Sequence, residues 1–320
     1  MNNSSDQPTS VRFVTVDENS VGQRLDNFLR KELLGVPKSY VYRVLRKGEV
    51  RVNKKRKKPE YKLEEGDIVR IPPTRTATRE EMAKLPSRML NELAQRVVYE
   101  DDGLLVLNKP AGLAVHGGSG VTSTALDAVR QLRPNLDYLE LAHRLDRPTS
   151  GCLVFAKSRE ALQAFLHELQ NGGVDKRYMA IVAGTWHDAG WIEHKLKRGE
   201  GEDRRVVSDD DGKVARSHFR PLEIFQPKPF AASYGKMKFT LVEVKLDTGR
   251  THQIRAHAAE EGKPLLGDDK YGDFPLNKAL ASVGCKRLCL HAHSLSFMWR
   301  GEKLLVNAEM DDDMRKVLSL

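Results

Sequence analysis

Apolar residues recur at helical spacing in two segments near the N-terminus. The first stripe consists of Leu25, Phe28, Leu29 and Leu33. The second stripe consists of Tyr40, Val41, Val44 and Leu45. Residues three and four apart share one face of a helix, so each stripe predicts an amphipathic helix. Gly48 is placed to end the second helix, because glycine readily adopts the left-handed backbone of a C-terminal cap.

Alternation replaces helical spacing after Gly48. Val50 and Val52 are separated by a charged residue, as in a half-buried strand. The run at 53–58 is charged throughout and predicts an exposed turn, and residues 61–71 predict further strand. Two helices followed by short strands indicate a small compact domain.

The larger part of the chain mixes strands and helices without a regular βαβ repeat. Strands are expected at 97–99, 104–108, 177–183, 237–246 and 288–297. A helix is expected at 159–170, with Ser158 as its N-cap and glycines at 172–173 as its stop. This pattern favours an α+β fold with a largely antiparallel mixed sheet flanked by helices and loops.

The same patterns divide the chain. Polar residues at the start lack apolar periodicity, and the stretch from Pro72 to Arg79 is typical of a linker. A polar segment that is expected to be helical follows it, up to about residue 95. The expected parts are a disordered tail at 1–13, a small domain at 14–73, a linker at 74–94 and a large domain at 95–320.

Composition indicates an ordinary folded protein. The chain has 320 residues, of which 40% are hydrophobic and 30% charged, and no apolar run approaches the roughly 18 residues of a membrane span. The polar N-terminus lacks the apolar segment of a secretory signal, and three cysteines make no disulfide framework. We therefore expect a cytoplasmic protein that has no membrane partner.

Positive charge is concentrated in one segment. Residues 38–62 contain eleven lysines and arginines against two acids, a surplus equal to the +9 net charge of the whole chain. A solvated charged face would explain such a run, but here the basic residues interleave with a folding pattern, which favours a surface for the phosphate backbone of a nucleic acid. The residues expected to dock this backbone, which the resemblance described below implies is RNA, are Lys38, Arg43, Arg46, Lys47, Arg51, Lys54, Lys55, Arg56, Lys57 and Lys58.

Several familiar sites are absent from the sequence. There is no phosphate-binding loop of the GK[ST] type, no GxGxxG fingerprint and no GxSxG elbow. Cys285, Cys289, His291 and His293 form the best metal-ligand candidate. The leucines between them instead indicate a core strand in which cysteine packs as a small hydrophobe, so no metal is expected.

A carboxylate stands between two arginines in LAHRLDRPTSG, residues 141–151. Asp146 lies beside Arg144 and Arg147, directly before an apolar run at 152–156. Burial favours the neutral form of a carboxyl group, and nearby positive charge favours the ionised form. We therefore expect the arginines to keep Asp146 charged at the edge of a dry pocket.

Two further stretches carry side chains suited to a site. In GRTHQIR, residues 249–255, Thr248 and Thr251 are expected to cap a helix that presents Arg255 beside an apolar Ile254. In KRY, residues 176–178, Tyr178 opens a strand and offers a ring that can stack on a base. Taken singly, each stretch has a structural explanation, an ion pair for Arg255 and core packing for Tyr178.

Together these motifs resemble the RluA/RluC family of RNA pseudouridine synthases, over residues 14–312. In chain order, the motifs are NKPAG at 108–112 with HG at 116–117, HRLDRPTSG at 143–151, KRY at 176–178, GRTHQIR at 249–255, GD at 267–268 with YG at 271–272, and LHA at 290–292. The small N-terminal domain resembles the α-L RNA-binding fold of a small-subunit ribosomal protein. The resemblance implies that the large domain has the pseudouridine synthase fold.

The resemblance also implies an activity and residue roles. The activity is cofactor-free isomerisation of uridine to pseudouridine in 23S ribosomal RNA, with the target base flipped out of its stack. Asp146 matches the essential aspartate, Tyr178 the active-site tyrosine and Arg255 the arginine paired with that aspartate. The residues expected to bind the substrate are His143, Arg144, Arg147, Arg250 and Ile254.

Other functions stay open at this point. The same chemistry on tRNA would use the same motifs, and a non-catalytic ribosome-assembly factor would keep the basic segment. A hydrolase that uses Asp146 with His143 or His252 is disfavoured, because no serine or cysteine nucleophile is placed to complete it. The expected partner is large-subunit ribosomal RNA or an assembly intermediate, bound by a monomer.

Overall fold

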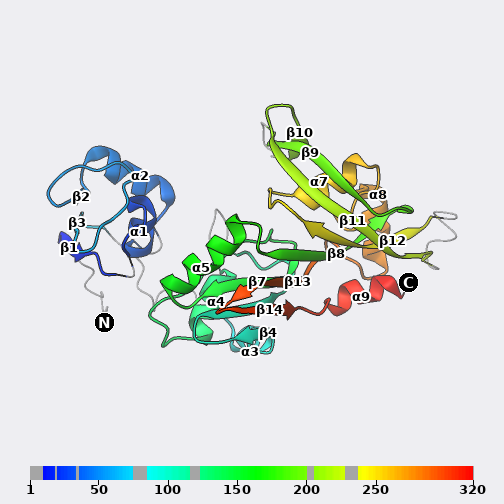
Figure 1. Cartoon of the computed structure of the whole chain (residues 1–320), viewed down its shortest axis with the longest axis horizontal. Helices are drawn as coiled ribbons and strands as arrows, with labels where there is room; N and C mark the ends of the chain where they lie inside the picture. The colour runs from blue at the N-terminus through cyan, green and yellow to red at the C-terminus, as the bar shows by residue number, and fades with distance from the viewer. Residues whose placement is uncertain are drawn as a thin grey trace, which may run out of the picture. The chain divides into compact units, whose positions relative to one another are not determined.

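The chain divides into two compact units, residues 1–86 and 87–320, which are described separately. The computed structural model describes residues 10–18, 20–33, 36–74, 85–115, 123–199, 205–227 and 237–319. Figure 1 shows both units. In the described part of the chain, no helix has the length and apolar character needed to cross a membrane.

The first unit packs two helices on a three-stranded antiparallel sheet of order β1-β3-β2. Its elements are β1 (Arg12–Thr15), α1 (Leu25–Glu32), α2 (Lys38–Lys47), β2 (Arg51–Val52) and β3 (Ile68–Ile71). The two predicted apolar stripes make its core together with strand residues such as Val52 and Val69. Gly48 ends α2 at a φ of 71°, so the predicted left-handed cap is confirmed.

A two-residue turn follows β2. The Val52 amide donates to the Lys55 carbonyl, and the Lys55 amide donates back to Val52, both at 2.9 Å. Asn53 and Lys54 between them have φ angles of 49° and 66°. Two positive φ angles make the tight turn that suits the twist of paired strands. The turn therefore exposes the basic run as predicted, and Asn53 takes a conformation that asparagine tolerates well.

The predicted N-terminal tail extends too far. Arg12 and Phe13 belong to β1 and pair with Ile71 and Arg70 of β3. An edge strand of four residues leaves too short an alternation to stand out against a polar background. Residues 1–9 of the predicted tail lie outside the described residues, as do residues 75–84 of the predicted linker.

The second unit is built on one large mixed sheet. Its main path has the order β10-β9-β11-β12-β8-β13-β7-β5-β4, with β14 on β13 and β6 on β7. The strands are β4 (Val97–Glu100), β5 (Leu104–Lys109), β6 (Glu140–Leu141), β7 (Ser150–Ala156), β8 (Asp175–Ala183), β9 (Gly190–Arg198), β10 (Val206–Ser208), β11 (Lys213–Phe225), β12 (Phe239–Leu246), β13 (Leu290–Trp299) and β14 (Glu302–Asn307).

One parallel pair joins the two halves of this sheet. β13 runs antiparallel to β8 on one side and parallel to β7 on the other, where Ala292 lies opposite Gly151. The other pairs among the described strands are antiparallel, as predicted. Gly151 has a φ of 110°, and a Cβ there would collide with the Ala292 carbonyl oxygen. Glycine is therefore required where β7 leaves the loop that carries Asp146.

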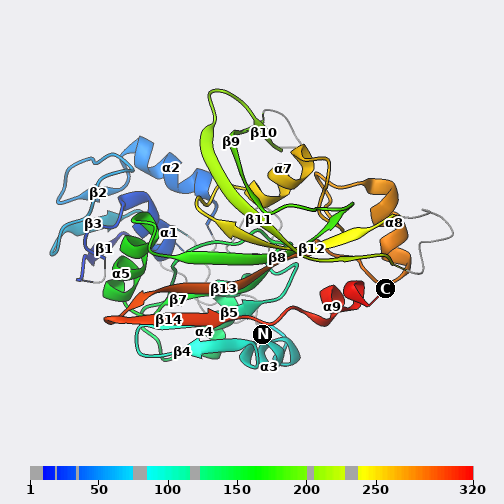
Figure 2. The same cartoon turned by 45° about the vertical axis from the view of Figure 1, so that its right-hand side comes forward.

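Helices cover the sheet on separate faces. They are α3 (Ser87–Ala94), α4 (Ala125–Leu132), α5 (Arg159–Gln170), α7 (Gln253–Glu260), α8 (Phe274–Ser282) and α9 (Asp312–Leu318). Ile254 of α7 packs with Ala180 and Val182 of β8, whereas Ile181, which points to the other face, packs with α8 and α9. Figure 2 shows α7 near β9 and β11. The first turn of α7 therefore faces the middle of the sheet.

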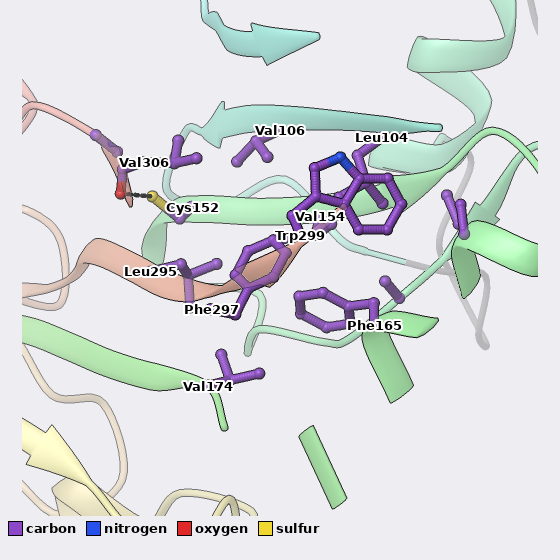
Figure 3. Packing of buried hydrophobic residues seen from close by; sticks show 14 of the residues in the cluster. Leu104, Val106, Cys152, Val154, Phe165, Val174, Leu295, Phe297, Trp299 and Val306 are labelled. Atoms are coloured by element: carbon purple, nitrogen blue, oxygen red, sulfur yellow. Dashed lines mark hydrogen bonds between the residues drawn. The ribbon is translucent and has the colours of Figure 1, made fainter. Parts of the chain in front are cut away.

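The core beneath β5, β7 and β13 is dense and aromatic. Phe165 of α5 meets Phe297 of β13 edge to face, with ring centroids 5.0 Å apart, and Trp299 lies next to them (Figure 3). Ser158 caps α5 by accepting a hydrogen bond from the Ala161 amide, as predicted. This core anchors β7, and with it one end of the Asp146 loop.

Some elements departed from the sequence prediction. Residues 87–94, assigned to the linker, form α3 and belong to the second unit. The long strand β11 was not predicted, and it contains Pro221 at a register irregularity with β12. Proline normally argues against a strand because it removes a hydrogen-bond donor, and the irregularity accommodates it.

Candidate active site

The loop that carries Asp146 lies between β6 and β7 and is tied to the segment after β5. The Gly112 amide donates to the Arg147 carbonyl at 2.9 Å, and Arg147 Nε donates back to the Gly112 carbonyl at 2.9 Å. Within the loop, the Thr149 amide donates to the Asp146 carbonyl at 3.1 Å. The backbone is therefore fixed on the C-terminal side of Asp146, and the carboxylate is presented from a defined turn.

A buried ammonium group supports this loop from below. Lys109 is 0% exposed. Its Nζ donates, at 2.9–3.1 Å, to the carbonyls of Pro110, Leu113 and Arg147. Burial lowers the pKa of Lys109 to about 7, against the opposing effect of Asp146. Three acceptors match the three donors of the charged form, so Lys109 both holds the loop and places positive charge near Asp146.

Tyr178 lies on β8 between two other strands, opposite Val244 of β12 and Ala292 of β13. Burial raises the pKa of the Tyr178 hydroxyl well above its usual range, and the charge of Asp146 acts in the same direction. The hydroxyl therefore keeps its proton at neutral pH. It has no hydrogen-bond partner among the residues that the structure describes, which leaves it available to a ligand.

The start of α7 differs from the predicted cap. The N-cap is His252, whose side chain makes no capping hydrogen bond. Thr248 Oγ1 instead accepts from the Arg216 amide of β11 at 2.9 Å and pairs with Gln253 Oε1 at 2.8 Å. Gln253 Oε1 also accepts from the Arg250 amide at 3.0 Å. The expected threonine cap was wrong because Thr248 bonds a strand 32 positions earlier in the chain.

Arg255 is buried on α7 and is held by two acids. Its Nε and Nη2 donate to the two carboxylate oxygens of Asp268 at 2.7 and 2.6 Å, and Nη2 also donates to Asp269 at 2.8 Å. Desolvation of the guanidinium is offset by Asp268 in particular, and the pKa of Arg255 is raised. Arg255 makes no ion pair with Asp146 within 4.0 Å, so the direct pairing expected from the resemblance is corrected.

His252 lies beside Asp146 in the lining of the site. Its Nε2 lies 3.9 Å from Asp146 Oδ2, and its Nδ1 lies 3.0 Å from the Tyr271 hydroxyl. Burial lowers the pKa of His252, and Asp146 opposes this effect. Its backbone is left-handed, with a φ of 53°. An uncommon conformation at a non-glycine residue is a reason to examine its function.

These elements enclose a cavity of about 100 Å³. It is lined by Arg144, Leu145, Asp146, Thr149, Tyr178, Leu246, Gly249, Arg250, Thr251, His252, Gln253, Ile254, Arg255 and Leu290. The Asp146 side chain is 21% exposed at its edge. The cavity thus combines one carboxylate, one aromatic ring and an apolar wall, and its lining includes no serine or cysteine to serve a hydrolase.

Most, but not all, of the predicted site residues meet at this cavity. Six of them line it: Arg144, Asp146, Tyr178, Arg250, Ile254 and Arg255. His143 does not, because its Nε2 accepts the Val154 amide at 3.1 Å and its ring stacks on Phe165. Arg147 does not line it either, since its guanidinium is turned to the Gly112 carbonyl. His143 is therefore corrected from a substrate contact to a support of the loop.

The cysteine and histidine cluster has other partners. His291 bonds Ser150 Oγ at 2.8 Å and the Ala308 carbonyl at 3.0 Å, and His293 bonds the same carbonyl. The thiols of Cys285 and Cys289 lie 3.6 Å apart. Across the described ranges, no group of three or more His, Cys, Asp or Glu side chains is arranged to hold a metal ion.

In the first unit, the predicted RNA-docking side chains are largely open to solvent. All ten are exposed except Lys57, which is half-buried. The ammonium of Lys57 lies 4.0 Å from the centre of the Tyr61 ring, and the guanidinium of Arg43 lies 4.6 Å from that of Tyr40. A cavity of about 400 Å³ opens among Tyr42, Leu45, Arg46, Arg56, Lys57, Lys58 and Pro59. Cations beside aromatic rings suit contact with both phosphates and bases.

Sequence reasoning missed four residues that shape the site. They are Lys109, His252, Asp268 and Tyr271. All four lie inside motifs that carried the resemblance, and this was the only available signal. Their partners come from distant segments, so no local spacing predicts which side chain each one contacts.

Comparison with known proteins agrees with this architecture. The RNA pseudouridylate synthase family model matches residues 103–260, and the S4 domain model matches residues 23–69. "Ribosomal large subunit pseudouridine synthase C" of Escherichia coli O157:H7 is 47% identical over 97% of this chain and 96% of its own. The protein of the same name from Pasteurella multocida (strain Pm70) is 44% identical over 97% and 93%.

Solved structures show the same fold. "Human RNA Pseudouridylate Synthase Domain Containing 1" has a TM-score of 0.56 at 25% identity, over 67% of this chain and 82% of its own. "Human RNA Pseudouridylate Synthase Domain Containing 4" has a TM-score of 0.58 at 24% identity, over 72% and 95%. The predicted fold class, a small RNA-binding domain followed by an α+β domain with a mixed sheet, is confirmed.

Proposed function

The chain belongs to the family of RNA pseudouridylate synthases, and on this basis we propose that it converts uridine to pseudouridine in the 23S RNA of the large ribosomal subunit. The identity to the large-subunit synthases over nearly the whole chain carries the proposal. The cavity supports it, because Asp146, Tyr178 and Ile254 meet there.

The reaction is an isomerisation that balances within the nucleoside. The bond between N1 of uracil and C1′ of ribose breaks, the base turns, and a bond forms between C5 and C1′. The hydrogen on C5 leaves as a proton, and N1 gains a proton. Because no electrons or atoms are gained or lost overall, the chemistry needs no cofactor.

Asp146 is the proposed catalytic group. An ionised carboxylate next to the sugar either attacks C1′ or removes the 2′ proton. The ammonium of Lys109 and the guanidinium of Arg255 lie close enough to Asp146 to influence it electrostatically.

Tyr178 and Ile254 are proposed to hold the flipped base. Ile254 is 3% exposed and packs in the same apolar cluster as Tyr178, so together they form a wall of the cavity. Removing a base from its stack costs a few kcal/mol, and an aromatic platform offsets about 1–3 kcal/mol of this. Arg144 and Arg250 line the same cavity and are exposed, where they suit phosphate contacts.

The first unit is proposed to bind the RNA through its basic surface, by phosphate contacts that recruit structured RNA without reading its sequence. We also propose a cytoplasmic location, which a ribosomal RNA substrate supports. We further propose that it acts as a monomer.

Replacement of Asp146 by Asn tests the proposed function. The variant keeps the side-chain shape and removes the charge, so pseudouridine formation in 23S RNA should fall by roughly 10⁴-fold or more. RNA affinity should stay within about twofold, since the lost carboxylate itself makes no phosphate contact. The measurement is chemical mapping of pseudouridine in 23S RNA and in tRNA, with wild-type and variant protein.

The outcomes separate the candidate functions. Modification of 23S RNA by the wild type alone supports the proposal, and modification confined to tRNA replaces the substrate. If Asp146→Asn turns over at the wild-type rate, Asp146 is not the catalytic group. Binding without turnover by the wild type would indicate a ribosome-assembly factor.

A further inference from the structure

The hydrogen bonds around His252 favour one tautomer of its ring. The Val206 amide donates to the Tyr271 hydroxyl at 2.6 Å. That hydroxyl therefore accepts from Val206, and its own hydrogen is free to be donated to His252 Nδ1 at 3.0 Å. Among the described residues, it has no other acceptor for this hydrogen. A neutral imidazole that accepts at Nδ1 carries its hydrogen on Nε2.

The protonated nitrogen faces the proposed catalytic carboxylate. Nε2 lies 3.9 Å from Asp146 Oδ2, longer than a hydrogen bond of 2.7–3.2 Å. The His252 and Asp146 side chains are 14% and 21% exposed, and both line the cavity. Hydrogen bonds in an empty active site are often long and shorten when the substrate is bound.

The backbone of His252 and the charged groups near its ring also indicate a role in the cavity. His252 stands at the N-cap of α7 with a φ of 53°, yet it does not cap the helix. Its ring lines the cavity instead, and the surrounding structure must hold the strained left-handed backbone in place. The other charged groups that face the ring are Asp268, Arg255 and Lys270, and Arg255 lies 5.3 Å from the centre of the Tyr271 ring.

We propose that His252 is a positioning residue for Asp146: Nε2–H donates to one carboxylate oxygen and leaves the other directed at the ribose of the flipped nucleoside. Tyr271 fixes the tautomer that makes this possible. The inference rests on the proposed function, because it assigns a partner to the carboxylate of that reaction.

A matched pair of substitutions separates the donor from the bulk of the ring. Glutamine places an amide N–H near the position of Nε2, and methionine has a similar length without a donor. Neither residue is β-branched, and both lack the preference of histidine for a left-handed backbone, so the two variants are matched in this respect. His252→Met should lower the rate of isomerisation by roughly 10- to 100-fold, the value of a hydrogen bond to a charged group. His252→Gln should recover most of this loss.

The readout is the single-turnover rate with excess enzyme on 23S RNA transcribed with uridine tritiated at C5, since isomerisation releases this hydrogen. RNA affinity and melting temperature are measured in parallel. A lower rate for methionine alone, with affinity unchanged, supports the proposal. Equal rates for His252→Met and wild type would overturn it. So would an equal loss in both variants, which would assign the ring a structural role.

A double-mutant cycle with Tyr271→Phe tests the link to the tautomer. In an otherwise wild-type protein, removing the hydroxyl should lower the single-turnover rate several-fold. In His252→Met it should lower the rate little further, because the donor is already gone. Additive losses would contradict the proposed link. Wild-type and Asp146→Asn proteins run beside these variants, so a wild type without tritium release would reject the proposed function, not this inference alone.

Discussion

At the scale of single residues, buried neutral histidines couple the fold to pH. Burial lowers the pKa of His143, His257 and His291 to about 4 in each case. His257 is 0% exposed, and neither ring nitrogen has a hydrogen-bond partner in the described structure. Its ring meets His194 with centroids 5.4 Å apart, and His194 also lowers the pKa. A proton on His257 would thus have no acceptor.

His257→Leu should make stability less dependent on acid. The unfolded chain binds a proton at His257 near pH 6.5 and the folded chain only near pH 4, so unfolding is favoured as the pH falls between these values. Above about pH 6.5 the residue has no such effect. As the pH falls from 6.5 to 4, the free energy of unfolding decreases in both proteins. The decrease should be smaller in His257→Leu than in the wild type, by up to about 3 kcal/mol.

Denaturant unfolding at pH 4.5 and pH 7.5 measures this difference. His167→Leu is the control, because the His167 side chain is 74% exposed and should leave the wild-type pH dependence in place. Equal pH slopes for His257→Leu and the wild type would show that the folded protein accommodates a charged imidazole at this position.

Residue identity was predictable from the sequence, but partners were not. Asp146, Tyr178 and Ile254 were expected at the site and line the cavity. Arg255 was expected there too, but Asp268 takes its ion pair. Asp268 lies in the loop after α7. This loop has no periodic pattern from which its return to Arg255 could be predicted. His252 went unassigned for a related reason, since its role depends on Tyr271 and Val206 from other segments.

At the scale of elements, the parallel pair β7–β13 leaves no room at Gly151. Gly151→Ala combines an unfavourable backbone with a collision against the Ala292 carbonyl. The substitution should destabilise the second unit by about 2 kcal/mol or more, because a side chain at such a φ is strained even in open space. Activity should fall as well, since β7 leads directly from the Asp146 loop.

Thermal unfolding and turnover of 23S RNA measure both effects. Gly190→Ala on β9 is the matched control: no atom lies within 4 Å of a Cβ built at Gly190. It should unfold within a few degrees of the wild type. If Gly151→Ala were as stable as this control, the prediction would be wrong, because β7 and β13 would then move apart at little cost in free energy.

Elements with a strong local period were predictable from the sequence, and those defined by distant pairing were not. α2 and α5 appeared with their predicted caps, because apolar stripes and capping residues are local signals. β1 was absorbed into the predicted tail, and β11 was missed. Both strands depend on pairing with distant segments. This pairing stabilises β1 despite its weak alternation and β11 despite its internal proline.

At the scale of the whole molecule, the chain joins a small basic unit to a large unit that contains the cavity. Neutralising residues 54–58, as glutamines, should weaken binding to 23S RNA. It should also reduce the slope of log affinity against log salt by up to about 4, since each lost phosphate contact removes roughly 0.7–0.9. Binding measured between 50 and 300 mM salt (about the range in which the effect is large) gives this slope.

A charge-matched control excludes a general effect of net charge. Five exposed residues of the second unit, Lys278, Lys286, Lys303, Arg315 and Lys316, are replaced in the same way. This variant has the same net charge as the first, and its salt slope should stay near that of the wild type. If both variants lose the same slope, the turn at 54–58 has no special place in the RNA interface.

The strand β13 also has a consequence for how the enzyme is made. It lies between β7 and β8 in the sheet and supplies Leu290 to the cavity. β7 follows Asp146, and β8 contains Tyr178. Until translation reaches β13, the sheet lacks the strand that lies between β7 and β8. A nascent or truncated polypeptide that stops short of residue 290 already contains every proposed catalytic side chain, yet it cannot bring them to a common pocket.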